Sequence, residues 1–306
     1  MAKKIITLFG ATGSLGLKIA QEFIAQGAHV RAVVRTTSNR TNLEKLGVTE
    51  FITGNMMDPS SLNAAMAVSP KADAVIASAA GYTGHTKGDN PKIDTEGYRN
   101  LADASKNAGI SRFILISILE CDKAPTVPHF FHKFQTEQYL RSIGQPFIAL
   151  RPGAFLDQTD DFVYPKVQKG IFPEFIPGVK MGMIYTPDLA RYAAMAAVSL
   201  PESALNTTID VGWDRPVSRD DLAAAFSTVL GKKIVAKPAF PGFVANNIMP
   251  ILGLFKENIK DLVAMIRWIK TGIYVSSDTM RQKELFSDLP SVEEAVRRYS
   301  KDRNLM

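Results

Sequence analysis

The sequence predicts an α/β protein whose core is a doubly wound parallel sheet. In residues 1–150, short apolar segments typical of buried strands alternate with segments of helical periodicity. A glycine-rich stretch, residues 10–16, stands between the first strand-like segment and the first helix-like segment. Strands that alternate with helices form parallel sheets with right-handed crossovers, so the pattern indicates a Rossmann-type sheet.

The predicted strands and helices follow one another with short connections. We expect strands at residues 5–9, 30–34, 51–53, 74–78, 113–116 and 147–150. Between them we expect helices at residues 15–26, 40–46, 59–67, 95–107 and 131–142. Asp58 and Pro59 are typical of an N-cap and a first helical residue, and a glycine shortly follows most of these helices.

The alternation ends after Arg151. Residues 153–182 are rich in glycine, proline and aromatic residues, and we expect an irregular excursion there. A helix then begins at Thr186 and ends near Leu200, and a further strand follows at residues 207–211.

The rest of the chain is predicted to be mainly helical. Ser218 and Asp221 have the spacing of a capping box, although Glu or Gln is preferred at the second position. Residues 243–271 and 291–303 are amphipathic. We therefore expect a core of residues 1–153, completed by residues 184–212. A smaller, mainly helical lobe or lid would comprise residues 154–183 and 213–306.

Composition excludes several classes of protein. Cys121 is the only cysteine, so we expect no disulfide framework and no cysteine-rich zinc site, which fits a reducing compartment. No apolar run reaches the ~18 residues that a membrane span needs, and the first strand begins too early to leave room for a signal peptide. A net charge of +6 without a dense Lys/Arg stripe suits an anionic small molecule and does not argue for nucleic acid. We expect a cytoplasmic protein, and the sequence leaves its oligomeric state open.

The glycines of residues 10–16 have the spacing that a dinucleotide site requires. Gly10 would allow a tight turn off the strand, and Gly13 would let the backbone approach a pyrophosphate. The positive end of the following helix attracts that anion, and Gly16 would let helix and strand pack closely. The alternative is a glycine-rich turn that binds no ligand.

Arg35 favours NADP(H) as the dinucleotide. Many Rossmann proteins carry a carboxylate at the end of the second strand, where it binds the adenosine ribose hydroxyls. This strand has none before Glu44 and ends at Arg35. A guanidinium at that place can bind a 2′-phosphate through two hydrogen bonds. The alternative is a solvated arginine at a strand end.

These motifs resemble those of the NmrA-like group of atypical short-chain dehydrogenases/reductases. The group includes isoflavone-reductase-like enzymes and NAD(P)H-dependent quinone reductases. The resemblance covers most of the chain and rests on residues 10–16, 30–35, 150–155 and 185–190. The first motif is shared by many dinucleotide binders, whereas the combination is fairly specific.

The resemblance implies that residues 1–153 form the NAD(P)-binding core and that the lobe binds the substrate. It also implies which residues surround the cofactor. Gly10, Thr12, Gly13, Ser14, Leu15 and Gly16 would surround the pyrophosphate, and Arg35 would meet the 2′-phosphate. Ala77, Ser78 and Ala79 would pass beside the ribose, and Pro152, Gly153, Ala154 and Phe155 would lie against the nicotinamide. Asn55 stands where relatives often place an aspartate near the adenine, and an amide can still hydrogen-bond adenine.

The catalytic residues implied by the resemblance are Lys133, His129 and Ser117. Short-chain dehydrogenases pair a tyrosine with a lysine four residues later, and here Lys133 resembles the lysine while His129 stands at the tyrosine position. The lysine would bind the nicotinamide ribose, and a histidine, with an ordinary pKa of about 6.5, can donate a proton at neutral pH. Ser117 resembles the serine that polarises a substrate carbonyl. We expect no metal, because His129 and His132 have no nearby third ligand.

Two functions remain open at this point. The first is an NADPH-dependent reductase that transfers hydride to a small apolar carbonyl or quinone-like substrate, with His129 or a water as the proton source. Some isoflavone-reductase-like relatives also lack the tyrosine and rely on the lysine. The second is a non-catalytic NADP(H)-binding regulator, redox sensor or assembly factor, in which His129 is a surface loop residue.

Overall fold

The structure is a computed structural model that describes residues 3–81, 90–158, 160–174, 176–239, 251, 257–276 and 278–306. The chain divides into two compact units, and each is described by itself. The first unit comprises Met1–Ile118, His129–Arg151 and Pro187–Ile209. The second unit comprises Leu119–Pro128, Pro152–Thr186 and Asp210–Met306.

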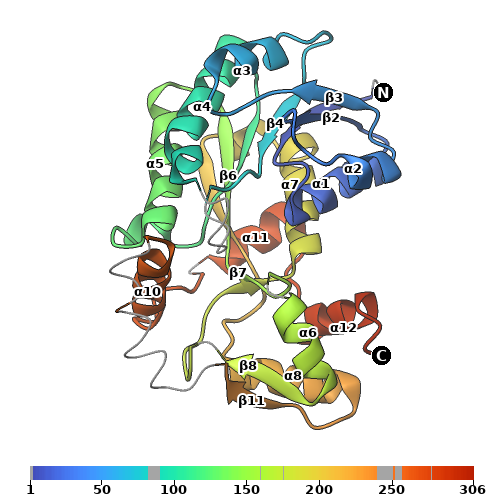
Figure 1. The fold of residues 1–306 in the computed structure, drawn as a ribbon, viewed down its shortest axis with the longest axis vertical. Coiled ribbons are helices and arrows are strands. Elements are labelled where there is room, and N and C mark those ends of the chain that lie inside the picture. Colours follow the sequence, from blue (N-terminus) through green and yellow to red (C-terminus); the bar gives the residue numbers. More distant parts are fainter. Residues whose placement is uncertain are drawn as a thin grey trace. The chain divides into compact units, whose positions relative to one another are not determined.

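The first unit is built on a seven-stranded sheet with the strand order β10-β6-β5-β4-β1-β2-β3. Its strands are β1 (Ile5–Phe9), β2 (His29–Val34), β3 (Glu50–Thr53), β4 (Ala74–Ala77), β5 (Phe113–Ile116), β6 (Phe147–Pro152) and β10 (Thr207–Val211). Each neighbouring pair in the series β6, β5, β4, β1, β2 and β3 is parallel (Figure 1). The order reverses on either side of β1, and ligands of such sheets bind at the carboxyl ends of the strands at this switch point. The predicted Rossmann-type fold is confirmed.

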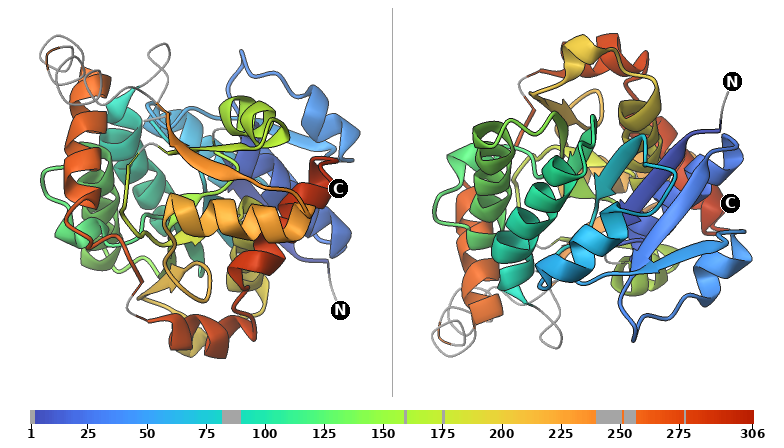
Figure 2. Two further views of the ribbon diagram at one scale, coloured as in Figure 1. Left: turned by 90° about the horizontal axis from the view of Figure 1, so that it is seen from below. Right: turned by 90° about the horizontal axis from the view of Figure 1, so that it is seen from above.

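Helices cover the sheet. They are α1 (Ser14–Ala25), α2 (Thr41–Lys45), α3 (Pro59–Met66), α4 (Tyr98–Asn107), α5 (Pro128–Ser142) and α7 (Thr186–Val198). Helices α3, α4 and α5 lie side by side (Figure 2). On the strands beneath them, alternate residues such as Phe113 and Leu115 are buried in one apolar cluster with Leu62, Leu101 and Leu140 of these helices. The intervening residues, such as Ile114, are buried as well. Burial of both faces is the pattern of a parallel sheet covered on two sides.

The second unit contains two short parallel strand pairs, five α-helices and a 3-10 helix (Cys121–Lys123) among its described residues. The strands are β7 (Ala154–Phe155), paired with β9 (Met183–Ile184), and β8 (Ile171–Glu174), paired with β11 (Val235–Pro238). The helices are α6 (Asp160–Gln168), α8 (Arg219–Leu230), α10 (Glu257–Ile269), α11 (Thr279–Phe286) and α12 (Val292–Asp302). Phe226 of α8 packs between Phe172 of β8 and Tyr299 of α12, with ring centroids 5.4 and 5.7 Å away. The capping box of Ser218 and Asp221 is present at the start of α8.

Two predictions are corrected by the structure, and a third lies partly outside the described residues. The excursion at residues 153–182 is not irregular throughout, because it contains β7, α6 and β8. Its glycines and prolines hide these short elements, and Pro165 even lies inside α6. Helix α5 begins three residues earlier than predicted, since Pro128 is itself helical. Of the amphipathic segment 243–271, residues 243–250 and 252–256 lie outside the described part.

Within the described residues, no helix combines the length and the apolar character that crossing a bilayer demands.

Candidate functional site

The turn between β1 and α1 can be built only with glycine at two positions. Gly10 has a φ of +78°, and a Cβ there would lie 2.6 Å from the backbone nitrogen of Ala79. A Cβ on Gly16 would lie 2.1 Å from the carbonyl oxygen of Gly10. Both approaches are far below van der Waals contact and involve backbone, so the turn is packed against the start of α1 and against the segment after β4.

The first turn of α1 is open to an anion. Gly13 is the N-cap residue and provides no side-chain cap, and no acidic residue lies in the first turn. Thr12, Gly13 and Ser14 are exposed, whereas Leu15 is half-buried. The N–H groups that begin a helix have no intrahelical partner and carry the positive end of the helix dipole. The predicted pyrophosphate residues therefore form a turn whose chemistry suits a phosphate.

The segment after β4 is tied to the end of β1. Both the backbone nitrogen and the Oγ of Ser78 donate to the carbonyl oxygen of Phe9, at 3.1 and 2.9 Å. The side chain of Ala77 is buried in the core beneath, so only its backbone could face a cofactor. Ala79 is half-buried and touches the glycine turn. These contacts bring the predicted ribose residues and the predicted pyrophosphate residues to one edge of the sheet.

Arg35 and Asn55 follow the neighbouring strands at the same edge. Arg35 comes directly after β2 and is exposed, in a turn closed by a 3.0 Å hydrogen bond from Ser38 N to Arg35 O. Its guanidinium makes no hydrogen bond or ion pair with the residues that the structure describes. Asn55 is also exposed, and its Oδ1 accepts a 3.0 Å hydrogen bond from Met57 N. The ligand roles predicted for both residues stay predictions.

Lys133 lies at the centre of a buried cluster in the first unit. Its Nζ lies 3.1 Å from Asp94 Oδ1, and the two side chains are only 7% and 3% exposed. The same nitrogen lies 3.4 Å from the carbonyl oxygen of Ala79 and 3.9 Å from the ring centroid of Tyr98. Asp94 Oδ2 accepts a 2.8 Å hydrogen bond from Gly81 N. Lys133 is thus bound to the segment after β4 both directly and through Asp94.

The charge of Lys133 is stabilised by these neighbours. Burial on its own lowers the pKa of Lys133, but the Asp94 carboxylate and the hydrogen bonds of the cluster more than offset it, so this pKa lies above its ordinary value. Burial in turn raises the pKa of Tyr98, whose hydroxyl donates to the carbonyl oxygen of Ala79. The cluster therefore holds a protonated lysine next to a neutral tyrosine at physiological pH.

His129 and Lys133 both lie in α5, four residues apart. Because α5 begins at Pro128, both belong to regular helix, and residues at this spacing share a helix face. His129 is half-buried, and its ring meets that of Phe130 edge to face, with centroids 4.7 Å apart. Its role as proton donor stays a prediction.

Ser117 belongs to a second buried polar group. Its Oγ donates to Glu137 Oε1 at 2.6 Å, and the Glu137 side chain is completely buried. Arg151 donates to both oxygens of Glu137, from Nε at 3.0 Å and from NH2 at 2.6 Å. The hydroxyl proton of Ser117 is therefore engaged with a carboxylate, and a role in polarising a substrate carbonyl stays a prediction.

Sequence reasoning missed Asp94, Tyr98, Glu137 and the pairing of Arg151. One signal was available for Glu137, which follows Lys133 by four residues on α5 and so shares its helix face. Asp94 and Tyr98 come from another part of the chain, a π-helical turn (Ile93–Gly97) and the start of α4. No local pattern connects them with Lys133.

Pro152, the last residue of β6, is grouped with Gly153, Ala154 and Phe155 in the second unit. Gly153 N donates to Val211 O at 3.2 Å, and a Cβ on Gly153 would lie 2.3 Å from Gly182 O, so glycine is required there. Ala154 and Phe155 form β7 and are half-buried. Their predicted contact with the nicotinamide stays a prediction.

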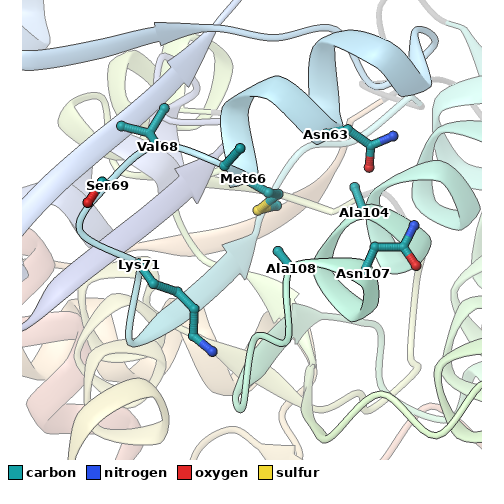
Figure 3. Close-up of a pocket in the computed structure, with 9 residues that line it drawn as sticks. Asn63, Met66, Val68, Ser69, Lys71, Ala104, Asn107 and Ala108 are labelled. Carbon is teal, nitrogen blue, oxygen red and sulfur yellow. The ribbon is translucent and has the colours of Figure 1, made fainter.

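A cavity of about 470 Å³ in the first unit lies elsewhere (Figure 3). It is lined by the carboxyl-terminal ends of α3 and α4, with Met66, Ala104 and the amides of Asn63 and Asn107 on its walls. These ends precede β4 and β5, so the cavity is at the opposite edge of the sheet from the glycine turn. Its one titratable lining residue, Lys71, donates to Gly109 O at 2.7 Å. The cavity is not the dinucleotide site.

The profile of the NmrA-like family matches residues 2–295. A curated relative, the photosystem II assembly factor Ycf39 of Synechocystis sp., is 30% identical over 209 residues. That alignment covers 68% of this chain and 62% of Ycf39, so the match spans less than two thirds of the relative's length.

Two solved structures share the fold over nearly the whole chain. The NADPH-dependent quinone oxidoreductase of Escherichia coli, in complex with NADPH, has a TM-score of 0.73 at 19% identity, covering 96% of this chain and 99% of that one. The triphenylmethane reductase of a Citrobacter species, in complex with NADP(H), has a TM-score of 0.72 at 23% identity, with the same two coverages.

Proposed function

The chain belongs to the NmrA-like family, and we propose that it is an NADPH-dependent reductase that transfers hydride to a small apolar carbonyl or quinone-like compound. The observation that carries the proposal is the buried, protonated Lys133, held next to the glycine turn by Asp94 and the Ala79 carbonyl. Burying an ammonium group is costly unless it is paired. A lysine maintained at such a place, beside a dinucleotide turn, supports a role in the chemistry.

NADP(H) is the cofactor that the residues fit. The exposed N–H groups of the first turn of α1 suit the pyrophosphate, and the exposed Arg35 guanidinium suits a 2′-phosphate. Both structural neighbours named above were solved with this cofactor. When bound, NADPH supplies the hydride.

The chain's own residues would position the reactants and control protons. Lys133 would donate hydrogen bonds to the nicotinamide ribose, and its fixed positive charge would stabilise negative charge that develops on a substrate oxygen. His129, on the same face of α5, or a water would deliver the proton. Ser117 would orient a substrate carbonyl only if its hydroxyl is shared with Glu137.

NADPH consumption in a panel of quinones, enones and ketones tests the proposal. We expect Lys133→Ala to lower turnover at least a hundredfold, because general acid–base and electrostatic groups contribute about that much. Lys106→Ala is the control, since Lys106 is exposed and only donates to Gly144 O at 2.7 Å. Full turnover in Lys133→Ala would contradict the role of this lysine.

The second candidate is a non-catalytic NADP(H)-binding assembly factor or regulator. It is favoured by the likeness to Ycf39 and by His129 at the place where short-chain dehydrogenases have tyrosine. Tight NADPH binding without turnover of any compound in the panel would support this candidate against the reductase.

A further inference from the structure

Arg219 is the first residue of α8 in the second unit. A cation is disfavoured at a helix N-terminus, where the helix dipole is positive. Arg219 does not serve as a cap either, because Ser218 Oγ accepts from Asp221 N at 3.1 Å and Asp221 Oδ2 accepts from Ser218 N at 2.8 Å. Arg219 therefore does not stabilise the start of α8.

The guanidinium of Arg219 has no oxygen acceptor among the residues that the structure describes. Five N–H donors belong to an arginine, yet the hydrogen-bond partner of this one is the Met183 sulfur, 3.9 Å from NH1. Its Nε is buried without a hydrogen-bond partner among the described residues. Its Cζ lies 5.7 Å from the ring centroid of Phe172. Both Met183 and Phe172 are buried, so they form a fixed wall against the guanidinium.

Burial lowers the pKa of Arg219 to about 10, although the carboxylate of Glu174 acts in the other direction. Glu174 does not form an ion pair with it in the described part of the chain, and Glu174 Oε1 accepts a 3.1 Å hydrogen bond from Gly178 N. Part of the Arg219 surface stays exposed, so solvent molecules can reach the residue.

Three other arginines that are buried or half-buried have oxygen partners. Arg31 donates to Glu50 Oε1 at 2.7 Å, Arg151 donates to Glu137, and Arg112 donates to two backbone carbonyl oxygens at 2.9 and 2.8 Å. A buried charge without such partners destabilises a fold. Residues that break the rules of stability in this way are expected at functional sites.

We propose that Arg219 anchors an oxyanion-binding site in the second unit, which takes the carboxylate or phosphate group of a small molecule. The planar guanidinium can receive two oxygens side by side, and its contacts with Met183 and Phe172 limit its movement. The proposal goes beyond the reductase activity and does not depend on it, since binding at Arg219 is measured without turnover.

The test is NMR of the full chain labelled with [15N]arginine. Benzoate and inorganic phosphate are titrated separately at constant ionic strength, and benzamide is the neutral counterpart of benzoate. Arg219→Lys assigns the Arg219 Nε–H resonance. Arg215→Met is the control for loss of a positive charge, because Arg215 is exposed and already paired with Asp214 and Glu293.

We expect at least one of the two anions to shift the Arg219 resonance saturably, while benzamide does not. Binding of benzoate alone identifies a carboxylate ligand, and binding of phosphate alone identifies a phosphate ligand. Measured by isothermal titration calorimetry with the same anion, binding should be at least tenfold weaker in Arg219→Met and unchanged in Arg215→Met. The proposal is overturned if neither anion shifts the resonance saturably, or if Arg219→Met binds the anion as tightly as the parent chain. The titration of the Arg219 resonance in the parent chain tests the proposal even if Arg219→Met does not fold.

Discussion

Arg31 and Arg35 lie four residues apart, one within β2 and the other just after its end, and their surroundings differ. Arg31 is inside the strand and buried, and it donates to Glu50 and to the carbonyl oxygens of Val68 and Pro70 at 3.2 Å. Arg35 is just past the strand and exposed. The same side chain thus stabilises the fold at one position and is available for a ligand at the other.

Arg35→Asp tests the 2′-phosphate assignment. Hydrogen bonds to charged groups contribute about 1.5–3 kcal/mol, so NADPH should bind roughly 10- to 100-fold more weakly. NADH lacks the 2′-phosphate and should lose little affinity. Dissociation constants measured by fluorescence titration check this. Equal losses for the two cofactors would refute the assignment.

Asp94→Asn tests how the charge of Lys133 is held. Removing one partner of a buried ion pair costs about 3–5 kcal/mol, and the loss should appear as a lower free energy of unfolding. In the parent chain the pKa of Lys133 is raised, so its stabilisation is complete below the unfolded pKa of about 10.4 and is lost as pH rises through the folded value. The difference between Asp94→Asn and the parent chain should therefore persist from pH 6 to pH 9.

Chemical denaturation at several pH values gives the measurement, and turnover against pH is the second readout. Without Asp94, burial lowers the pKa of Lys133, so turnover should fall at a lower alkaline pH than in the parent chain. Asp103→Asn is the control, because Asp103 is exposed and accepts from the Tyr139 hydroxyl at 2.8 Å. An unchanged pH profile in Asp94→Asn would show that Asp94 does not control the lysine.

At the scale of elements, the turn before α1 makes the clearest steric demand. Gly16→Ala would place a Cβ 2.1 Å from Gly10 O, and α1 would have to move away from the turn. Overpacking of this kind costs typically about 1–3 kcal/mol, and it should also weaken NADPH binding. Gln21→Ala, on the exposed face of α1, should change neither quantity. Thermal unfolding with and without NADPH measures both effects, and an unchanged affinity in Gly16→Ala would contradict the proposed phosphate site.

The elements also show what sequence can and cannot predict. The bounds of β1, β5 and β10 agree with prediction. In β1 and β5 a continuous apolar run marks a strand that is buried on both faces. Lys133 could be proposed as a catalytic residue because its segment resembles that of short-chain dehydrogenases. Its partner Asp94 could not, because it lies in a π-helical turn, where an extra residue per turn changes which side chains face inward. The short elements within residues 153–182 were hidden by glycine and proline.

At the scale of the whole molecule, the described contacts divide the chain into two units, while the family profile runs through both. The first unit contains the glycine turn, Arg35 and the Lys133 cluster. The second unit contains residues 152–155 and the half-buried Arg219. The assignment of the first as cofactor core and of the second as substrate lobe stays a prediction that ligand-bound structures would test.

The central claim is that this chain transfers hydride, and deuterium transfer tests it most directly. NADPH labelled with deuterium at C4 on one or the other face is incubated with an enone or ketone from the panel, and the product is analysed by mass spectrometry. The reductase account predicts that one of the two labelled forms delivers deuterium to a product carbon, and that Lys133→Ala forms at most about a hundredth as much of this product. Tight NADPH binding with no deuterated product from any compound would contradict it.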